Sequence, residues 1–381
     1  MAQKLLVIGA RSIPDAEGGI EKYVTEMLPR LAELGFETHA VCMNTHGAED
    51  HFRGVSISRV PTLSLFLTDK HIYLLFALYT ALRVRPDVIL LLGTAATLLT
   101  LPSLLLAKRV VVRCGLFDTQ SNKWGLLGRL FISLAEAQYR FASGIIGVST
   151  DIAKSLRLHA GRAPVVFIPN GLDAARQNLS NDLDARITGR YILAVGRMTR
   201  QKDYLTLARA FKRCSAPDVQ LVICGASDGS LSSAELAEFE HDRIVWLGFI
   251  KKPALYSYLQ GASVYVNSSI VEGMSNSLLE AMSYDRPIVA SDISANREVS
   301  QIPGCAYFPV GDVQALALKL DNALLHPDRY VADKTTALTW DDVAKMTGAF
   351  LHPDQTAVEG NRDETVPSFR PAQETVSKEA R

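Results

Sequence analysis

Short apolar runs alternate with stretches of helical periodicity along most of the chain. In the first half the apolar runs are KLLVIGA, THAVCM, DVILLL, RVVVRC, SGIIGVS and PVVFIPN. Between the first two lies IEKYVTEMLPRLAEL, whose apolar positions recur with the period of an amphipathic helix, and Gly35 follows as a helix stop. Strands and helices that alternate in this way are typical of a doubly wound parallel sheet.

A second series of the same kind follows a polar segment that has no hydrophobic period. Its apolar runs are YILAVG, VQLVICG, RIVWLGF, SVYVNSS, RPIVAS and CAYFPV. The sequence therefore predicts an α/β fold of two tandem Rossmann-like domains, residues 1–175 and 190–350, with a linker at 176–189 and a ligand cleft between the domains. Residues 351–381 are mostly polar and predict a disordered tail.

Composition narrows the possible functions. The chain has 381 residues, 48% of them apolar, which is enough for two well-filled cores. Its 40 basic and 40 acidic side chains balance, so no long-range field would recruit nucleic acid, and an anion must be bound by a few local groups. The five scattered cysteines indicate core thiols in a reducing compartment rather than disulfides or a metal site. The N-terminal apolar run is too short for a signal peptide, and we expect a cytoplasmic protein.

Two apolar stretches bear on membranes. Residues 88–107 carry no charge and are long enough to cross a bilayer, but Gly93, Thr94 and Pro102 favour a buried strand, a turn and a short helix. The shorter stretch HIYLLFALYTALRVR, residues 71–85, predicts an amphipathic helix that could also touch a membrane surface.

The first candidate site lies in AVGRMTRQKDYLTLARAF. There Gly196, Arg197 and Lys202 fall between the first strand of the second domain and its following helix, at the edge of a parallel sheet where ligands bind. Two cations beside a helix N-terminus repel it unless an anion lies between them, and a diphosphate would suit this position. The alternative is a solvated turn in which Asp203 relieves the repulsion.

The second candidate site lies in SIVEGMSNSLLEAMSYDRPIVAS. Glu272 and Gly273 fall in the turn after a strand, and the amides of residues 275–278 begin a helix that also contains Glu280. Carboxylates opposite cations and helix amides would suit a nucleotide sugar. A capping box, in which Glu280 bonds back to the amide of Ser277, would explain Glu280 without a ligand but leaves Glu272 unexplained.

These residues carry a resemblance to a known family. The E-x7-E pattern of EGMSNSLLEAM, preceded by VGRMTRQK and IPNGLD, resembles the retaining glycosyltransferases of family 4, which have the two-domain GT-B fold. IGARSIPDAEGGIEKYVTEMLPRLAELG is similar to the family's N-terminal glycine loop and first helix, and the resemblance covers roughly residues 4–350.

The resemblance implies roles for individual residues. Arg197 and Lys202 would hold the donor diphosphate, Glu272 would contact the sugar hydroxyls, and Glu280 would bind the ribose. The predicted catalytic residues are Arg197, Lys202 and Glu272. The other positions implied to contact the donor are Gly18, Gly19, Gly196, Phe249, Ile250, Gly273, Met274, Ser275, Asn276 and Ser277.

One feature departs from the family pattern. Members often carry a histidine after a strand of the first domain, near the donor sugar, but the run here is RVVVRCGLFDTQSNKWG, and no histidine lies between His71 and His159. We expect Arg113, Cys114 or Asp118 to supply this contact, or the acceptor chemistry to differ. A covalent role for Cys114 stays open beside the ordinary packing role of a thiol at a strand end.

The resemblance implies transfer of a sugar from a nucleotide diphosphate to an acceptor hydroxyl, with retention and without a metal or other cofactor. The D-x-D at residues 182–184 lies in the polar linker and is discounted as a metal motif. By analogy the acceptor is a lipid-linked saccharide at the inner membrane face, in surface polysaccharide assembly, with no nucleic acid partner. Two alternatives are a non-catalytic nucleotide-sugar-binding scaffold and a GT-B epimerase.

Overall fold

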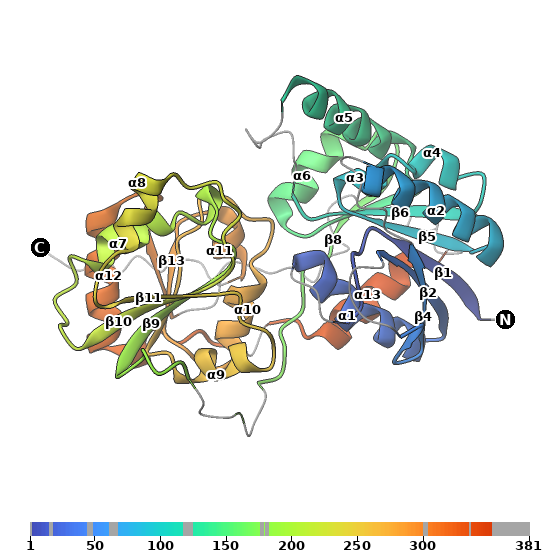
Figure 1. Ribbon diagram of the computed structural model, residues 1–381. Helices are drawn as coiled ribbons and strands as arrows, with labels where there is room; N and C mark the ends of the chain where they lie inside the picture. Colours follow the sequence, from blue (N-terminus) through green and yellow to red (C-terminus); the bar gives the residue numbers. More distant parts are fainter. Residues whose placement is uncertain are drawn as a thin grey trace, which may run out of the picture.

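The protein folds into two α/β units that lie side by side (Figure 1). A computed structural model describes residues 2–14, 18–43, 49–60, 68–116, 125–175, 179, 183–299, 304–334 and 337–352. Each unit has its own central sheet and its own apolar clusters. The predicted fold class, two tandem Rossmann-like parallel-sheet domains in a GT-B arrangement, is confirmed.

The first sheet has the strand order β3-β4-β2-β1-β5-β6-β7-β8. Every neighbouring pair is parallel except β3 with β4, a short hairpin that the hydrophobic pattern did not predict. The strands are β1 (Gln3–Ile8), β2 (Phe36–Met43), β3 (His51–Phe52), β4 (Val55–Val60), β5 (Val88–Leu92), β6 (Arg109–Cys114), β7 (Gly144–Gly147) and β8 (Val165–Phe167).

Helices cover both faces of the first sheet. Those between its strands are α1 (Gly19–Glu33), α2 (Thr68–Val84), α3 (Thr94–Thr97), α4 (Thr100–Ser103), α5 (Leu126–Ala137), η2 (Gln138–Phe141) and α6 (Thr150–His159). One face packs against α1, through residues such as Tyr23 and Met27. The other packs against α2, α3, η2 and α6, through residues such as Tyr73, Ala96 and Tyr139. Figure 1 shows α2, α4 and α5 on the opposite side of the sheet from α1.

The second sheet is parallel throughout, in the order β11-β10-β9-β12-β13-β14. Its strands are β9 (Arg190–Val195), β10 (Val219–Cys224), β11 (Ile244–Gly248), β12 (Val264–Asn267), β13 (Ile288–Ser291) and β14 (Cys305–Phe308). The helical segments after β9 are η3 (Arg200–Lys202), α7 (Tyr204–Phe211), α8 (Ser233–Leu236), η4 (Ala237–Phe239), α9 (Ala254–Gly261), α10 (Asn276–Ser283), α11 (Ser294–Val299), α12 (Val313–Leu325), η5 (Pro327–Tyr330) and α13 (Trp340–Leu351).

The last helix returns to the first domain. Trp340, Val343 and Leu351 of α13 are buried in the same cluster as Tyr23 and Met27 of α1. The prediction that residues 190–350 form the second domain is therefore wrong at its C-terminal end. The chain crosses between the domains twice, and the crossings run together where Leu172 forms a bridge with Thr339. The tail predicted at 351–381 lies outside the described residues from 353 onward.

The uncharged stretch 88–107 forms the predicted buried strand, β5, and two short helices, α3 and α4. Thr94, which was expected in a turn, is the first residue of α3. Among the residues that the structure describes, no helix is both long enough and apolar enough to span a bilayer.

Candidate functional site

The predicted glycine loop of the first domain faces the predicted donor turn of the second. A Cβ atom on Gly19, at the start of α1, would lie 3.5 Å from Nδ2 of Asn276 at the start of α10. On Gly273 it would lie only 1.6 Å from the carbonyl oxygen of Gly115, which follows β6. These contacts join segments that follow β1 and β6 of one sheet to the segment that follows β12 of the other. The cleft is thus formed by the carboxyl ends of both sheets, where ligands of open α/β sheets bind.

Lys202 and Glu272 form one charged pair in this cleft. Nζ of Lys202 lies 2.5 Å from Oε1 of Glu272, and Oγ of Ser269 donates to the same oxygen at 2.7 Å. Lys202 can take this path because Gly196 lacks a side chain: a Cβ there would lie 2.8 Å from Cε of Lys202. Gly196 also has a φ of 147°, which favours glycine.

The other two cations of this turn, Arg197 and Arg200, differ from Lys202 in their ion-pair partners. Arg197 is exposed and forms no ion pair with any residue that the structure describes, so its guanidinium is available to a ligand. Arg200, three residues on, is bound to Glu235 by two hydrogen bonds of 2.6 and 2.8 Å. Asp203 caps α7 by accepting from the amide of Thr206, so it does not neutralise Lys202 as the solvated-turn alternative required.

The start of α10 is held by serine hydroxyls. Oγ of Ser275 caps the helix by accepting from the amide of Leu278 at 3.3 Å, and it is itself held by Nδ2 of Asn267 at 3.0 Å. Ser277 is bonded to the hydroxyl of Tyr265 at 2.8 Å. The capping box proposed for Ser277 and Glu280 does not form. The cap lies two residues earlier, and the carboxylate of Glu280 has other partners.

Glu280 is buried between two lysines. Nζ of Lys22 in α1 lies 2.6 Å from Oε1 of Glu280, and Nζ of Lys252 lies 2.5 Å from the same oxygen. Burial by itself would raise the pKa of Glu280, but the two ammonium groups outweigh it and hold the pKa below its usual value. Both lysines use Oε1, and within the described residues no hydrogen bond uses Oε2. One carboxylate oxygen therefore remains to accept from a ligand.

Lys22 also binds Asp173 at 2.5 Å, in the first crossing between the domains. Burial alone would lower the pKa of Lys22, but Glu280 and Asp173 outweigh it and raise the pKa well above its usual value. Asp173 accepts in addition from Nε1 of Trp340 at 2.7 Å. The sequence analysis missed Lys22, Lys252 and Asp173. Their positions in the sequence were the available signal: Lys22 lies three residues after Gly19 of the glycine loop, and Lys252 lies two residues after Ile250 of the GFI turn.

Arg113 and Cys114 point to opposite faces of β6. Arg113 is buried, lies 3.8 Å from the ring centre of Tyr23, and donates to Oδ1 of Asn170 at 2.6 Å. Nδ2 of Asn170 in turn donates to Oδ1 of Asn276 at 2.9 Å, across the cleft. Burial lowers the pKa of Arg113 from its usual value. Cys114 is buried in the opposite cluster, and its thiol donates to the carbonyl oxygen of Leu116 at 3.6 Å.

Of the remaining predicted residues, Met274 contacts both domains. Met274 accepts a hydrogen bond from the amide of Asn170 at 3.0 Å and packs against clusters of both domains. Phe249 is 46% exposed, and Ile250 packs on the second domain. Gly18, exposed, has a φ of 138°, and a Cβ there would meet the carboxylate of Glu21. Asp118 lies outside the described residues.

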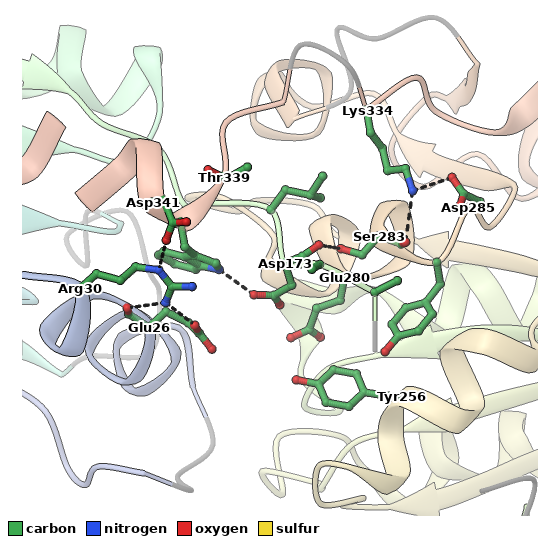
Figure 2. A pocket seen from close by; sticks show the side chains of 15 residues that line it. Glu26, Arg30, Asp173, Tyr256, Glu280, Ser283, Asp285, Lys334, Thr339 and Asp341 are labelled. Carbon is green, nitrogen blue, oxygen red and sulfur yellow. Dashed lines mark hydrogen bonds and ion pairs between the residues drawn. The ribbon is translucent and has the colours of Figure 1, made fainter. Parts of the chain in front are cut away.

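A cavity of about 540 Å³ opens beside Glu280, between α1 and α13 on one side and α9 and α10 on the other (Figure 2). Figure 2 shows the carboxylates of Asp173 and Glu280 and the phenol of Tyr256 converging on its centre. On one wall Arg30 bonds to Glu26 and Asp341, and on the other Lys334 bonds to Asp285. The cavity adjoins both crossings, so its shape depends on the relative position of the domains.

Two family models match the chain, one on each domain. The model described as Glycosyltransferase Family 4 matches residues 17–176, and the model described as Glycosyl transferases group 1 matches residues 189–326. Their boundary coincides with the change from the first sheet to the second.

Curated relatives match at moderate identity. An uncharacterised glycosyltransferase of Methanocaldococcus jannaschii is 28% identical over 45% of this chain and 45% of its own length. The N-acetylgalactosamine-N,N'-diacetylbacillosaminyl-diphospho-undecaprenol 4-alpha-N-acetylgalactosaminyltransferase of Campylobacter jejuni is 25% identical over 72% of this chain and 78% of its own length. A phosphatidyl-myo-inositol mannosyltransferase of Mycobacterium leprae is 30% identical over 60% of this chain and 64% of its own length.

Solved structures share the fold over nearly the whole chain. A sucrose-phosphate synthase of Thermosynechococcus elongatus superposes with a TM-score of 0.76 at 19% identity, covering 91% of this chain and 98% of its own. HepE of Anabaena, solved in complex with UDP-glucose, gives a TM-score of 0.64 at 18% identity, covering 91% and 95%. A glycosyltransferase family model matches each domain, and the two-domain architecture is shared with solved glycosyltransferases. The chain is therefore a glycosyltransferase of the family 4 type with the GT-B fold.

Proposed function

We propose that the protein transfers a sugar, with retention of configuration, from a nucleotide-diphosphate sugar to an acceptor hydroxyl. The observation that carries the proposal is the Lys202–Glu272 pair beside the N-terminus of α10, in the cleft that the Gly18–Gly19 loop also lines. This places a cation, a carboxylate and free helix amides at one point where a phosphate and a sugar can meet.

In this proposal the donor lies along the second domain. Its diphosphate is held by Lys202, Arg197 and the first amides of α10, and its base lies against Phe249 and Ile250. The ribose hydroxyls donate to Oε2 of Glu280, the oxygen that the two lysines leave open. The binding of UDP-glucose by HepE of Anabaena, a protein of the same fold, supports a nucleotide-sugar donor.

The reaction breaks the bond between the anomeric carbon and the phosphate oxygen and forms a bond to the acceptor oxygen on the same face of the ring. Negative charge grows on the leaving diphosphate, where Lys202 and Arg197 meet it in a preorganised site. The leaving phosphate takes the acceptor proton, so no side chain is needed as a base. Since these cations and amides supply the positive charge, we propose that the transfer proceeds without a metal.

The acceptor in this proposal is a lipid-linked saccharide that enters from the first domain. The relatives from Campylobacter jejuni and Mycobacterium leprae are named for a diphospho-undecaprenol and a phosphatidyl-inositol acceptor, which supports this class.

One observation favours a second candidate, a non-catalytic nucleotide-sugar-binding scaffold. Arg113 and Cys114, which stand where the family often has a histidine, are both buried and bonded within the first domain. An epimerase that acts on the donor itself is a third.

A ligand screen followed by product analysis tests these candidates. Thermal unfolding is measured with a panel of UDP-, GDP- and ADP-sugars, because a bound donor raises the melting temperature by mass action. The stabilising donor is then incubated with and without a polyprenyl-diphosphate saccharide, with and without a chelator, and products are followed by NMR. We expect a product whose anomeric configuration matches the donor. Donor binding with no turnover would favour the scaffold, and an altered sugar nucleotide without acceptor would favour the epimerase.

A further inference from the structure

A second direct contact joins the two domains through helices α6 and α11. Thr150, the first residue of α6, donates its amide to both carboxylate oxygens of Glu298 in α11, at 3.0 and 2.9 Å. The hydroxyl of Thr150 lies 3.4 Å from one of the same oxygens. Figure 1 shows α6 and α11 on the sides of the two domains that face each other. A carboxylate of the second domain is thus bonded to the start of a helix of the first.

Glu298 completes the cap of α6. The first amides of a helix have no partner within the helix and need one from elsewhere. The hydroxyl of Ser149 accepts from the amide of Ile152 at 3.3 Å, and Glu298 accepts from the amide of Thr150. A carboxylate also suits the positive end of the helix dipole. Helix α6 is therefore capped by its own serine and, in addition, by a residue of the other domain.

The capped turn lies beside the candidate site. Val148 comes just before α6, and its amide donates to the carbonyl oxygen of the last residue of β6 at 3.3 Å. A Cβ atom on Gly273 would lie 3.3 Å from Cγ2 of Val148 and 1.6 Å from the carbonyl oxygen of Gly115. We name Gly115 and Val148 the first-domain wall. Because Gly273 directly follows Glu272, this wall is the part of the first domain that packs beside Glu272.

The surroundings of Glu298 do not require a charged group. Burial raises the pKa of its carboxyl, and the hydrogen bonds from Thr150, which act in the opposite direction, do not outweigh it. Of the charged side chains of α6, Asp151 raises the same pKa and Lys154 lowers it. A neutral side chain of the same shape, glutamine, can accept the bond from Thr150, which provides a conservative variant.

We propose that Glu298 is a positioning residue for the transfer: by holding the first turn of α6, it holds the first-domain wall at its distance from Glu272. Glu298 acts through α6 and not by touching a substrate. The inference rests on the proposed function, in which an acceptor that enters from the first domain must reach a sugar beside Glu272. A small change in the distance between these two sides would misalign the reacting groups.

Amide hydrogen exchange of the full-length protein without substrates, followed by mass spectrometry, tests the positioning. We expect Glu298→Met to speed exchange in residues 148–152 about fivefold, as when one partly exposed hydrogen bond is lost, and to speed exchange in residues 269–276 as well. Glu298→Gln should exchange like the wild type. The matched control is Glu240→Met, which alters an exposed glutamate of the second domain directly after η4.

Steady-state kinetics test the consequence for the transfer. Glu298→Met should lower kcat about tenfold and leave the KM for the donor unchanged, because the first-domain wall moves and the donor site does not. Glu298→Gln should restore kcat, and Glu240→Met should match the wild type. Melting temperatures establish that each variant is folded.

Thr150→Pro removes the other half of the contact. Proline lacks an amide hydrogen and is well tolerated at the first position of a helix. Ser149 has a φ of −138° and a ψ of 161°, the extended conformation that a residue before proline prefers. We expect Thr150→Pro to reproduce the kinetics of Glu298→Met. The double variant should lose no more than either single variant, because both substitutions remove the same bond.

Three results would overturn the positioning role. They are unchanged exchange in Glu298→Met, a loss in Glu298→Gln as large as in Glu298→Met, and losses that multiply in the double variant. The expected exchange pattern in a wild type that transfers no sugar would count against the proposed function, and would confirm that Glu298 holds the first-domain wall.

Discussion

Lys22 of the first domain and Glu280 of the second are joined across the cleft by an ion pair of 2.6 Å. Both side chains are nearly inaccessible to solvent, at 10% and 5% exposure, so the pair links the domains in an environment where charges interact strongly. Because Asp173 and Trp340 extend the same network, the relative position of the domains is coupled to the carboxylate that we expect to bind ribose.

Replacing Lys22 by methionine should weaken this link. Glu280 would remain buried with Lys252 as its single cation, and we expect the free energy of unfolding to fall by about 2 to 3 kcal/mol. Denaturant unfolding measures this loss. In the control, Lys4→Met removes an exposed pair with a separation of 3.9 Å and should cost less than about 1 kcal/mol. Equal losses of unfolding free energy in the two variants would show that the interdomain pair stabilises the fold no more than an exposed surface pair does.

The stability that Glu280 contributes should depend on pH in a defined direction. Its pKa in the folded protein lies below the usual 4.5, so its contribution is present above that pH and is lost as the pH falls. The difference in stability between the wild type and Glu280→Gln should therefore be largest near neutral pH and shrink below pH 4.5. Unfolding curves of both proteins over this range measure it, and a difference that grows on acidification would contradict the assignment.

Gly273→Ala should open the cleft without unfolding either domain. The added Cβ would lie 1.6 Å from the carbonyl oxygen of Gly115, so the domains must separate. We expect a larger radius of gyration in X-ray scattering and a fall in transfer rate of about 100-fold, a loss typical of misplaced reacting groups. Gly189→Ala is the control, since its Cβ would make an ordinary contact of 3.5 Å far from the cleft. An unchanged rate in Gly273→Ala would mean that the close contact is not used in turnover.

Lys202 and Arg200 form a matched pair for testing the donor site. Only Gln201 separates them, but Lys202 binds Glu272 inside the cleft and Arg200 binds Glu235 outside it. We expect Lys202→Ala to lower kcat by about 100- to 1000-fold, as when one preorganised donor of charge stabilisation is removed. Arg200→Ala should stay near the wild-type rate. If Lys202→Ala transferred sugar normally, the site would have to lie elsewhere.

Local sequence was sufficient for the strands and for the position of the donor turns. A buried parallel strand is an uninterrupted apolar run, and its carboxyl end fixes the edge at which Lys202 and Glu272 meet. The hydrogen-bond partners of individual side chains were harder to predict. By sequence pattern, Ser275 and Ser277 are equally good N-caps for α10. Ser275 is the cap in the structure, and its hydroxyl is held in place by Asn267.

Long-range placement could not be predicted in the same way. The amphipathic pattern of α13 shows that one side of the helix is buried but not which domain buries it. Trp340 packs on α1 only because the chain crosses back beside Leu172. Local sequence gives Lys22 no visible partner, since Glu280 is 258 residues away.

Arg113 and Cys114 can be separated experimentally because they are neighbours on one strand with opposite surroundings. The guanidinium of Arg113 holds Asn170, which holds Asn276 at the start of α10, whereas the thiol of Cys114 is packed in the other cluster. We expect Arg113→Met to weaken donor binding and slow transfer, since the start of α10 loses a support from the first domain. Cys114→Ser should keep kcat within about threefold of the wild type, because buried structural cysteines are inert. Steady-state kinetics and donor titration compare the two variants. The reverse order of effects, or a sugar covalently attached to Cys114 in mass spectra of the wild type, would show that Cys114 takes part directly in the transfer.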